Sequence, residues 1–160
     1  MSAGAEITVR CARDDDLPKI VDFNARLADE TEALELDRTV LERGVRKLLG
    51  DRSRGEYFIA EIDGRIAGQL MITREWSDWR DGDIWWVQSV YVAPEFRRRG
   101  AFRALYKFVR DRAKDAQAVG LRLYVEQDND SAQRTYESLG MRRARYRLMQ
   151  EMFRGDADHE

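Results

Sequence analysis

The sequence predicts one domain of mixed α/β (α+β) class, in which helices and strands alternate along the chain. Its length of 160 residues is typical of a single domain with one core. Apolar residues make up 43% of the chain and charged residues 36%, a balance typical of folded proteins and not of disordered ones. Apolar residues recur at helical spacing in some segments and in β-branched or aromatic runs in others. We expect a single domain over residues 1–160, with a disordered tail at 155–160.

The chain begins with a predicted strand and helix. Residues 7–10 alternate between apolar and polar side chains, which favours a short strand. Residues 13–30 open with aspartates and Pro18 and continue with apolar residues at helical spacing. This pattern predicts a helix whose N-cap is Asp15 or Asp16.

A second helix and a hairpin follow. Residues 35–50 carry another helical stripe that ends at Gly50. Residues 56–76 contain two apolar runs joined by Asp63 and Gly64. Asp-Gly between two such runs is the strongest short pattern for a two-residue hairpin turn.

The second half of the chain predicts strands alternating with helices. Residues 83–93 are rich in aromatic and β-branched residues and predict a strand. Apolar residues from Phe102 onward recur at helical spacing. Residues 120–127 predict a strand, residues 128–140 a capped helix, and residues 141–153 one or two final strands.

Charge and rare residues exclude several kinds of function. The net charge is −2, whereas a general nucleic-acid binder usually carries a surplus of basic residues. Cys11 is the only cysteine and His159 the only histidine, which argues against disulfides, zinc sites and Ser-His or Cys-His catalysis. The N-terminus does not resemble a signal peptide, and no apolar run is long enough to span a membrane. We expect a cytoplasmic protein that binds no nucleic acid, membrane or metal.

Three consecutive arginines, Arg97 to Arg99, stand between a predicted strand and a helix that begins after Gly100. A helix N-terminus offers unpaired N–H groups and a partial positive charge, and arginines add fixed charge and forked donors. This arrangement predicts a diphosphate site, with a merely solvated turn as the alternative. The sequence has no G-x-x-x-x-G-K-[ST] and no G-x-G-x-x-G motif, so neither a P-loop nor a dinucleotide fold is supported.

The arginine-rich stretch resembles the acyl-CoA-binding motif of the GNAT superfamily of N-acetyltransferases. That motif is a strand ending in V-x-P, followed by [RQ]-x-x-G-x-[GA] at the start of a helix. Val92, Pro94, Arg97 and Gly100 match, but Phe102 stands where the family has a small residue. We expect the Phe102 side chain to turn into the core and to leave its amide available.

A second stretch resembles the family's N-x-x-A-x-x-x-Y-x-x-x-G-[FM] segment. Asn129, Ala132, Tyr136, Gly140 and Met141 match it, about 30 residues after the first motif. Taken singly, Asn129 could be only a helix cap and Tyr136 only a core residue. Both motifs in the right order favour the family.

The resemblance implies a mixed, mostly antiparallel sheet flanked by helices, with two central parallel strands that splay apart, here residues 84–92 and 120–126. Acetyl-CoA would be the cosubstrate, with no metal, and its pantetheine arm would pair with free backbone groups of the first strand. The residues that the resemblance assigns to the cofactor are Val90, Tyr91, Val92, Arg97, Arg98, Arg99, Gly100, Ala101, Phe102, Arg103 and Asn129.

The resemblance also implies an N-acetyltransferase. It would move an acetyl group to a primary amine of a small molecule, polyamine-like included, or of a protein, by direct attack in a ternary complex. Tyr136 would be the general acid. Gln88 stands where many members have a glutamate base, and glutamine cannot accept a proton. Three explanations stay open: a water chain that ends on Glu30, Glu32 or Glu35, an acceptor amine of low pKa that needs no base, or a non-catalytic acyl-CoA sensor. Glu30, Glu32 and Trp86 are candidates for the acceptor side, and a homodimer is a further expectation.

Overall fold

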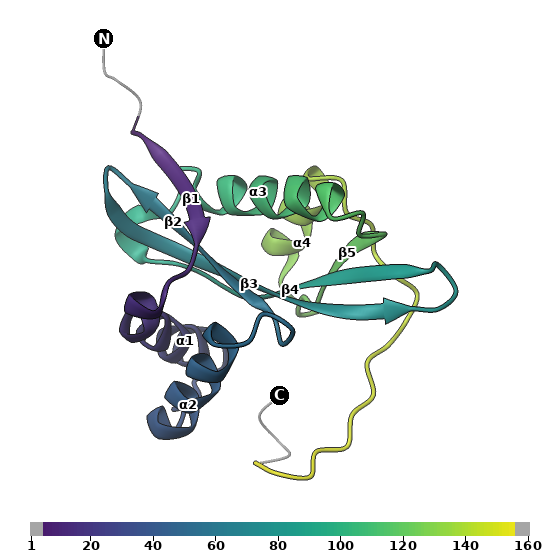
Figure 1. Cartoon of the computed structure of the whole chain (residues 1–160), viewed down its shortest axis with the longest axis horizontal. Helices are drawn as coiled ribbons and strands as arrows, with labels where there is room; N and C mark the ends of the chain where they lie inside the picture. The colour runs from purple at the N-terminus through teal and green to yellow at the C-terminus, as the bar shows by residue number, and fades with distance from the viewer. Residues whose placement is uncertain (1–4, 156–160) are drawn as a thin grey trace. The chain divides into compact units, whose positions relative to one another are not determined.

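The computed structural model describes residues 5–155, which divide into two units, Met1–Leu123 and Tyr124–Glu160. The described part of the first unit contains a five-stranded sheet and three α-helices, and that of the second contains one α-helix (Figure 1). The elements of the first unit are β1 (Ile7–Cys11), a 3₁₀ turn (Asp14–Asp16), α1 (Leu17–Glu32), α2 (Arg38–Leu49), β2 (Glu56–Ile62), β3 (Arg65–Ser77), β4 (Gly82–Val92), a second 3₁₀ turn (Pro94–Phe96), α3 (Ala101–Asp115) and β5 (Gly120–Leu123). The second unit contains α4 (Asp130–Ser138).

The sheet is mixed and mostly antiparallel, as predicted. Its strand order is β1-β2-β3-β4-β5, with antiparallel pairing as far as β4 and parallel pairing between β4 and β5. The turn between β2 and β3 is the predicted Asp63-Gly64, and both residues have positive φ, 50° and 74°. Positive φ at both turn positions is what a type I′ hairpin requires.

Helices cover both faces of the sheet. In Figure 1, α3 lies on one face and α1 and α2 lie on the other. Alternate residues of the strands supply the two cores. Phe58 packs in the cluster that contains Leu105 and Val109 of α3, whereas Ile59 packs with Ile20 of α1 and its neighbours. The hydrophobic alternation of the strands thus fixes which face each helix covers.

Strand β4 contains a β-bulge in its second half. Gln69 and Met71 of β3, two positions apart, pair with Tyr91 and Gln88 of β4, which are three positions apart. Strand β4 therefore has one extra residue in this interval. Ser89, inside the bulge, has a left-handed φ of 49°.

Parallel pairing between β4 and β5 is short. It runs from the Ile84–Gly120 pair to the Val87–Leu123 pair and stops there. From Gln88 onward, the edge of β4 that faces β5 has no further pairing with that strand among the described residues. The pairing ends with β5 itself, because Leu123 is the last residue of that strand.

The final strands predicted after residue 140 are wrong for the described part of the chain. Residues 141–155 contain no strand, and β5 is therefore the edge of the sheet rather than a central strand. A strand needs hydrogen-bonding partners along its length, and the arginine-rich alternation of this segment does not supply them by itself. Of the predicted tail, residues 156–160, including His159, lie outside the described residues.

The start of α1 differs in detail from the prediction. Asp16 does occupy the N-cap position, but its carboxylate caps no helix amide. It accepts from the Arg10 guanidinium at 2.7 and 3.0 Å and from the Arg13 amide at 2.7 Å. Asp16 thereby ties β1 to the turn before α1. None of the helices in residues 5–155 is both long and apolar enough to cross a bilayer.

Candidate functional site

The turn between β4 and α3 exposes backbone N–H groups. Arg98 and Gly100 both have left-handed φ, 63° and 93°, and no side chain caps the helix. The first helical hydrogen bond runs from the Ala104 amide to the Gly100 carbonyl at 3.0 Å. The earlier amides of the first turn, such as those of Ala101 and Arg103, have no acceptor within the helix. Such a turn suits a bound anion.

Glycine is required at position 100 by conformation. Its φ of 93° is one that residues with a side chain rarely adopt, whereas an added Cβ would only touch the Ile7 Cδ1 atom at 3.4 Å, so the backbone conformation and not crowding favours glycine. The predicted match of Gly100 to the family motif therefore has a physical basis in this chain.

The side chain of Arg97 is already engaged within the protein. Its Nε donates to the Val92 carbonyl at 2.9 Å, and its Nη2 lies 2.7 Å from Glu30 Oε2. The Tyr91 hydroxyl donates to the other oxygen of Glu30 at 2.8 Å, and the Arg97 guanidinium stacks 5.5 Å from the Tyr91 ring centroid. Two hydrogen bonds lower the pKa of Glu30: the larger effect comes from Arg97 and the smaller from Tyr91. Glu30, which we predicted for the acceptor side, thus pairs with an arginine of the predicted cofactor turn. Glu32, the other predicted glutamate, is the last residue of α1 and is exposed.

The other arginines of the turn are more available. Arg99 lies 3.6 Å from Asp63 and stacks on the Phe96 ring at 5.7 Å. Arg98 and Arg103 are exposed, and within residues 5–155 neither forms an ion pair. These two guanidinium groups are the ones that an anion at the turn could bind without displacing a carboxylate.

We predicted that Phe102 heads the buried stripe of α3, and this prediction is wrong. That stripe begins at Ala101, which is 2% exposed, and continues through Leu105 and Val109. Phe102 lies one position further round the helix, is half-buried, and has its ring 6.2 Å from that of Tyr106. The small residue that packs into the core is thus at position 101 and not at 102.

Gln88 and Trp86 lie on the same face of β4, as predicted from their spacing. They pair across the sheet with Met71 and Thr73, and the Gln88 Nε2 donates to the Thr73 hydroxyl at 2.7 Å. Trp85, on the opposite face, is 3% exposed and belongs to the core. The side chain at the usual base position is therefore an amide that donates a hydrogen bond and cannot take a proton from an amine.

The second unit holds the remaining predicted residues. The Asn129 side chain accepts from the Ala132 amide at 3.1 Å and so caps α4. Gln133 is buried and donates to the carbonyls of Glu126 and Gln127 at 2.9 and 2.8 Å, which fixes the segment before the helix. Burial raises the pKa of the Tyr136 phenol, which therefore keeps its proton at neutral pH.

Residues 21–141 match the family model described as "Acetyltransferase (GNAT) family". The chain belongs to the GNAT family of acetyltransferases. A "possible acetyltransferase" from Clostridium difficile 630 shares 45% identity and a TM-score of 0.86, over 93% of this chain and 99% of that one.

More distant GNAT-like structures share the fold. A "predicted acetyltransferase with acetyl-CoA" from Clostridium acetobutylicum has 17% identity and a TM-score of 0.75, over 91% of this chain and 96% of that one. A "Ribosomal-protein-alanine N-acetyltransferase" from Brucella melitensis biovar Abortus 2308 has 19% identity and a TM-score of 0.74, over 92% and 99%. No curated protein matches the chain.

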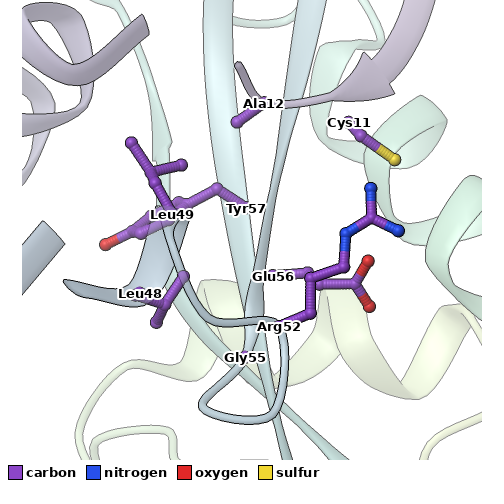
Figure 2. Close-up of a pocket in the computed structure, with 8 residues that line it drawn as sticks. All are labelled: Cys11, Ala12, Leu48, Leu49, Arg52, Gly55, Glu56 and Tyr57. Atoms are coloured by element: carbon purple, nitrogen blue, oxygen red, sulfur yellow. The ribbon is translucent and has the colours of Figure 1, made fainter. Parts of the chain in front are cut away.

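Two cavities of this GNAT domain lie away from the predicted cofactor residues. One, of about 30 Å³, has room for a single water; in Figure 2 the Arg52 side chain reaches towards Cys11 at its edge. It is lined by Cys11, Ala12, Leu48, Leu49, Arg52, Gly55, Glu56 and Tyr57. The other, of about 410 Å³, is lined by Glu56, Arg74, Asp83, Trp85, Arg112, Asp115 and Ala116. Neither contains a residue of the bulge or of the arginine-rich turn.

Among the described residues, no group of three or more His, Cys, Asp or Glu side chains could hold a metal ion.

The structure contains a buried polar network next to the bulge that the sequence analysis did not predict. Gln69 is fully buried, and its Nε2 donates to the Ser89 carbonyl at 3.1 Å and to Asn24 Oδ1 at 3.3 Å. Asn24 in turn donates to the Tyr57 hydroxyl at 3.0 Å. The one indication in the sequence was a lone glutamine inside the apolar run of β3.

Proposed function

We propose that this GNAT acetyltransferase uses acetyl-CoA to acetylate a primary amine by direct attack in a ternary complex. The observation that carries the proposal is the succession of two features along the chain. The edge of β4 from Gln88 to Val92 is not paired with β5, which ends at Leu123, and it leads into a turn whose amides suit an anion. An extended pantetheine arm with a diphosphate at its end needs these two features in this order.

The cofactor would contact mainly the backbone. The amides from Arg98 to Arg103 would bind the diphosphate, with Arg98 and Arg103 as the charged side chains. Backbone groups of Val90 and Val92 would pair with the pantetheine arm. The acetyl-CoA in the Clostridium acetobutylicum relative supports this choice of cosubstrate, and the Brucella enzyme supports a nitrogen acceptor.

The transfer needs a neutral amine, an oxyanion donor and a proton for the leaving group. Holding a lysine-like amine neutral at pH 7 costs about 4.6 kcal/mol, because its pKa is about 10.4. Gln88 cannot accept the proton that the ammonium group must lose, so that proton goes to water. The Gln88 amide only orients the amine or the water. The amine nitrogen then attacks the acetyl carbon, and the Val90 N–H binds the resulting oxyanion. After the attack the nitrogen gives its extra proton to water. As the C–S bond breaks, Tyr136 gives its proton to the CoA sulfur and regains one from water, so that the products are the amide and the free thiol.

Calorimetry and a thiol-release assay test the proposal in two steps. We expect CoA and acetyl-CoA to bind, and acetyl-CoA to release free thiol in the presence of at least one amine from a panel of polyamines, lysine peptides and peptides with a free N-terminus. Failure of either cofactor to bind would refute both the enzyme and its alternative. Binding without thiol release on any amine would favour the non-catalytic acyl-CoA sensor, the alternative that Gln88 in place of a base supports.

A further inference from the structure

We propose that Gln69 is a positioning residue that aims the Val90 N–H at the acetyl carbonyl of bound acetyl-CoA. Asn24 and Tyr57 hold the Gln69 amide in place. The inference rests on the proposed function of the Val90 N–H and adds the residues that set its direction. None of the three belongs to either sequence motif of the family resemblance.

The bulge needs a support because its backbone is strained. Ser89 is not glycine, yet it has a left-handed φ of 49°. Conformations of this kind cost on the order of 1–3 kcal/mol and persist only where the surrounding contacts enforce them. Here the main-chain carbonyl of Ser89 accepts a hydrogen bond from a side chain, Gln69 Nε2 at 3.1 Å.

Planarity of the peptide bond turns that contact into a direction for Val90. The Ser89 carbonyl and the Val90 N–H belong to one peptide unit, and the chain has no cis peptide among the described residues. In a trans peptide the carbonyl and the N–H point in opposite directions. Because the carbonyl points at Gln69 on β3, the Val90 N–H points away from Gln69.

The orientation of the Gln69 amide is itself determined. Its Nε2 faces two acceptors, the Ser89 carbonyl and Asn24 Oδ1. A flipped amide would set oxygen against oxygen at both contacts. Asn24 cannot flip either, since its Nδ2 would then face Gln69 Nε2, donor against donor; in the observed orientation Nδ2 donates to the Tyr57 hydroxyl.

The network is costly for the fold, which is why a role in positioning explains it better than a role in packing. Gln69 is 0% exposed, and its Oε1 has no hydrogen-bond partner within residues 5–155 although the atom is buried. An unsatisfied buried acceptor destabilises the folded state, and an apolar side chain of similar volume would not carry that cost. Buried polar groups with an unpaired atom call for a specific explanation.

The test compares Gln69→Met, which keeps the volume and removes the donor, with Ile72→Val, which trims a fully buried residue of the same strand on the opposite face. The first measurement is the infrared carbonyl stretch of bound acetyl-CoA carrying ¹³C at the acetyl carbonyl, and it needs no acceptor amine. In the wild type a hydrogen bond from Val90 lowers this frequency relative to free acetyl-CoA. We expect Gln69→Met to lose most of that shift and to change the dissociation constant for CoA by no more than about two-fold. Ile72→Val keeps both the shift and the affinity.

Turnover gives the second readout. Once an acceptor is known, we expect Gln69→Met to lower kcat by about 10- to 100-fold with KM for acetyl-CoA little changed, as for a weakened oxyanion donor. If Gln69→Met does not fold, Tyr57→Phe, which removes only a hydroxyl, should show a smaller frequency change of the same sign.

Two failures remain distinguishable. If the wild type binds acetyl-CoA with the lowered frequency and the variants keep it, the role of Gln69 is refuted and the proposed function stands. If the wild type does not bind acetyl-CoA, the proposed function fails, and the inference fails with it.

Discussion

Glu30 and Arg97, 67 positions apart in the chain, form an ion pair with an N–O distance of 2.7 Å. The pair joins the C-terminal end of α1 to the turn that precedes α3. Tyr91 of β4 completes it by donating to the same carboxylate. This ion pair therefore connects two parts of the predicted site. One is the turn that we assign to the diphosphate, and the other is α1, which we expected beside the acceptor.

This contact predicts that Glu30→Gln strengthens CoA binding. The substitution releases the Arg97 guanidinium for the diphosphate, and an exposed pair of this kind is worth up to about 1 kcal/mol, or an affinity gain of about two- to five-fold. Calorimetry with CoA measures it. Glu32→Gln is the matched control, because it removes the same charge two residues away from an exposed position at the end of α1. Weaker binding by Glu30→Gln, or an equal gain by Glu32→Gln, would contradict the assignment.

Replacement of Gly100 by alanine should weaken both the fold and the cofactor site. A left-handed φ costs a residue with a Cβ about 1–2 kcal/mol, and relaxation of the turn should disperse the amides and lower CoA affinity about ten-fold or more. Thermal unfolding and calorimetry measure the two effects. Gly44→Ala is the control: Gly44 lies inside α2 with no atom within 4 Å of the added Cβ, so it should raise stability by about 0.5–1 kcal/mol and leave CoA binding unchanged.

Asp16→Asn should destabilise the fold in a pH-dependent way. Burial alone would raise the pKa of Asp16, but hydrogen bonds from Arg10 and from the Arg13 amide more than offset it, and the pKa is lowered. A carboxylate with a lowered pKa stabilises the fold fully above its unfolded-state pKa of about 3.9 and loses that contribution as the pH falls through the folded-state value. We expect a loss of about 1.5–3 kcal/mol at neutral pH, the usual contribution of hydrogen bonds to a charged group.

Urea denaturation at neutral pH and at about pH 3 measures this difference. The gap between wild type and Asp16→Asn should narrow at the lower pH. Asp15→Asn, at the exposed neighbouring position, should have little effect at either pH. A gap that stays constant or widens on acidification would show that the Asp16 carboxylate is not the source of the stability.

Tyr136→Phe should lower turnover without lowering affinity. The proposed proton transfer to the CoA sulfur contributes about 100-fold or more when a general acid supplies it, so kcat should fall by that order while the dissociation constant for CoA stays the same. Because burial raises the pKa of Tyr136 above its usual value of about 10, its ionisation should not limit kcat below about pH 10. Tyr146→Phe, at an exposed position, is the control. Unchanged kcat in Tyr136→Phe would remove the tyrosine from the mechanism.

Local patterns in the sequence predicted most of the first unit. The Asp63-Gly64 turn formed as expected because its two positive φ angles depend only on local chemistry. Gly100 and the arginine-rich turn could likewise be located from the sequence, since a helix N-terminus is a local feature.

Contacts between distant residues could not be predicted in the same way. The engagement of Arg97 by Glu30 depends on where α1 packs, and the network of Gln69, Asn24 and Tyr57 joins three elements. The strands expected after residue 140 were wrong for the described residues, because alternation of apolar and polar side chains does not by itself supply the hydrogen-bonding partners that a strand needs.

The most direct test of the central claim is titration of the ¹⁵N-labelled protein with CoA, followed by backbone amide chemical shifts. The claim is that the turn from Arg97 to Arg103 binds the CoA diphosphate through its amides. We expect the largest shift changes at the amides from Arg98 to Arg103 and along Val90 to Val92, with small changes at Gly44 in α2. Saturating CoA that leaves the Arg98 to Arg103 amides unmoved would contradict the account.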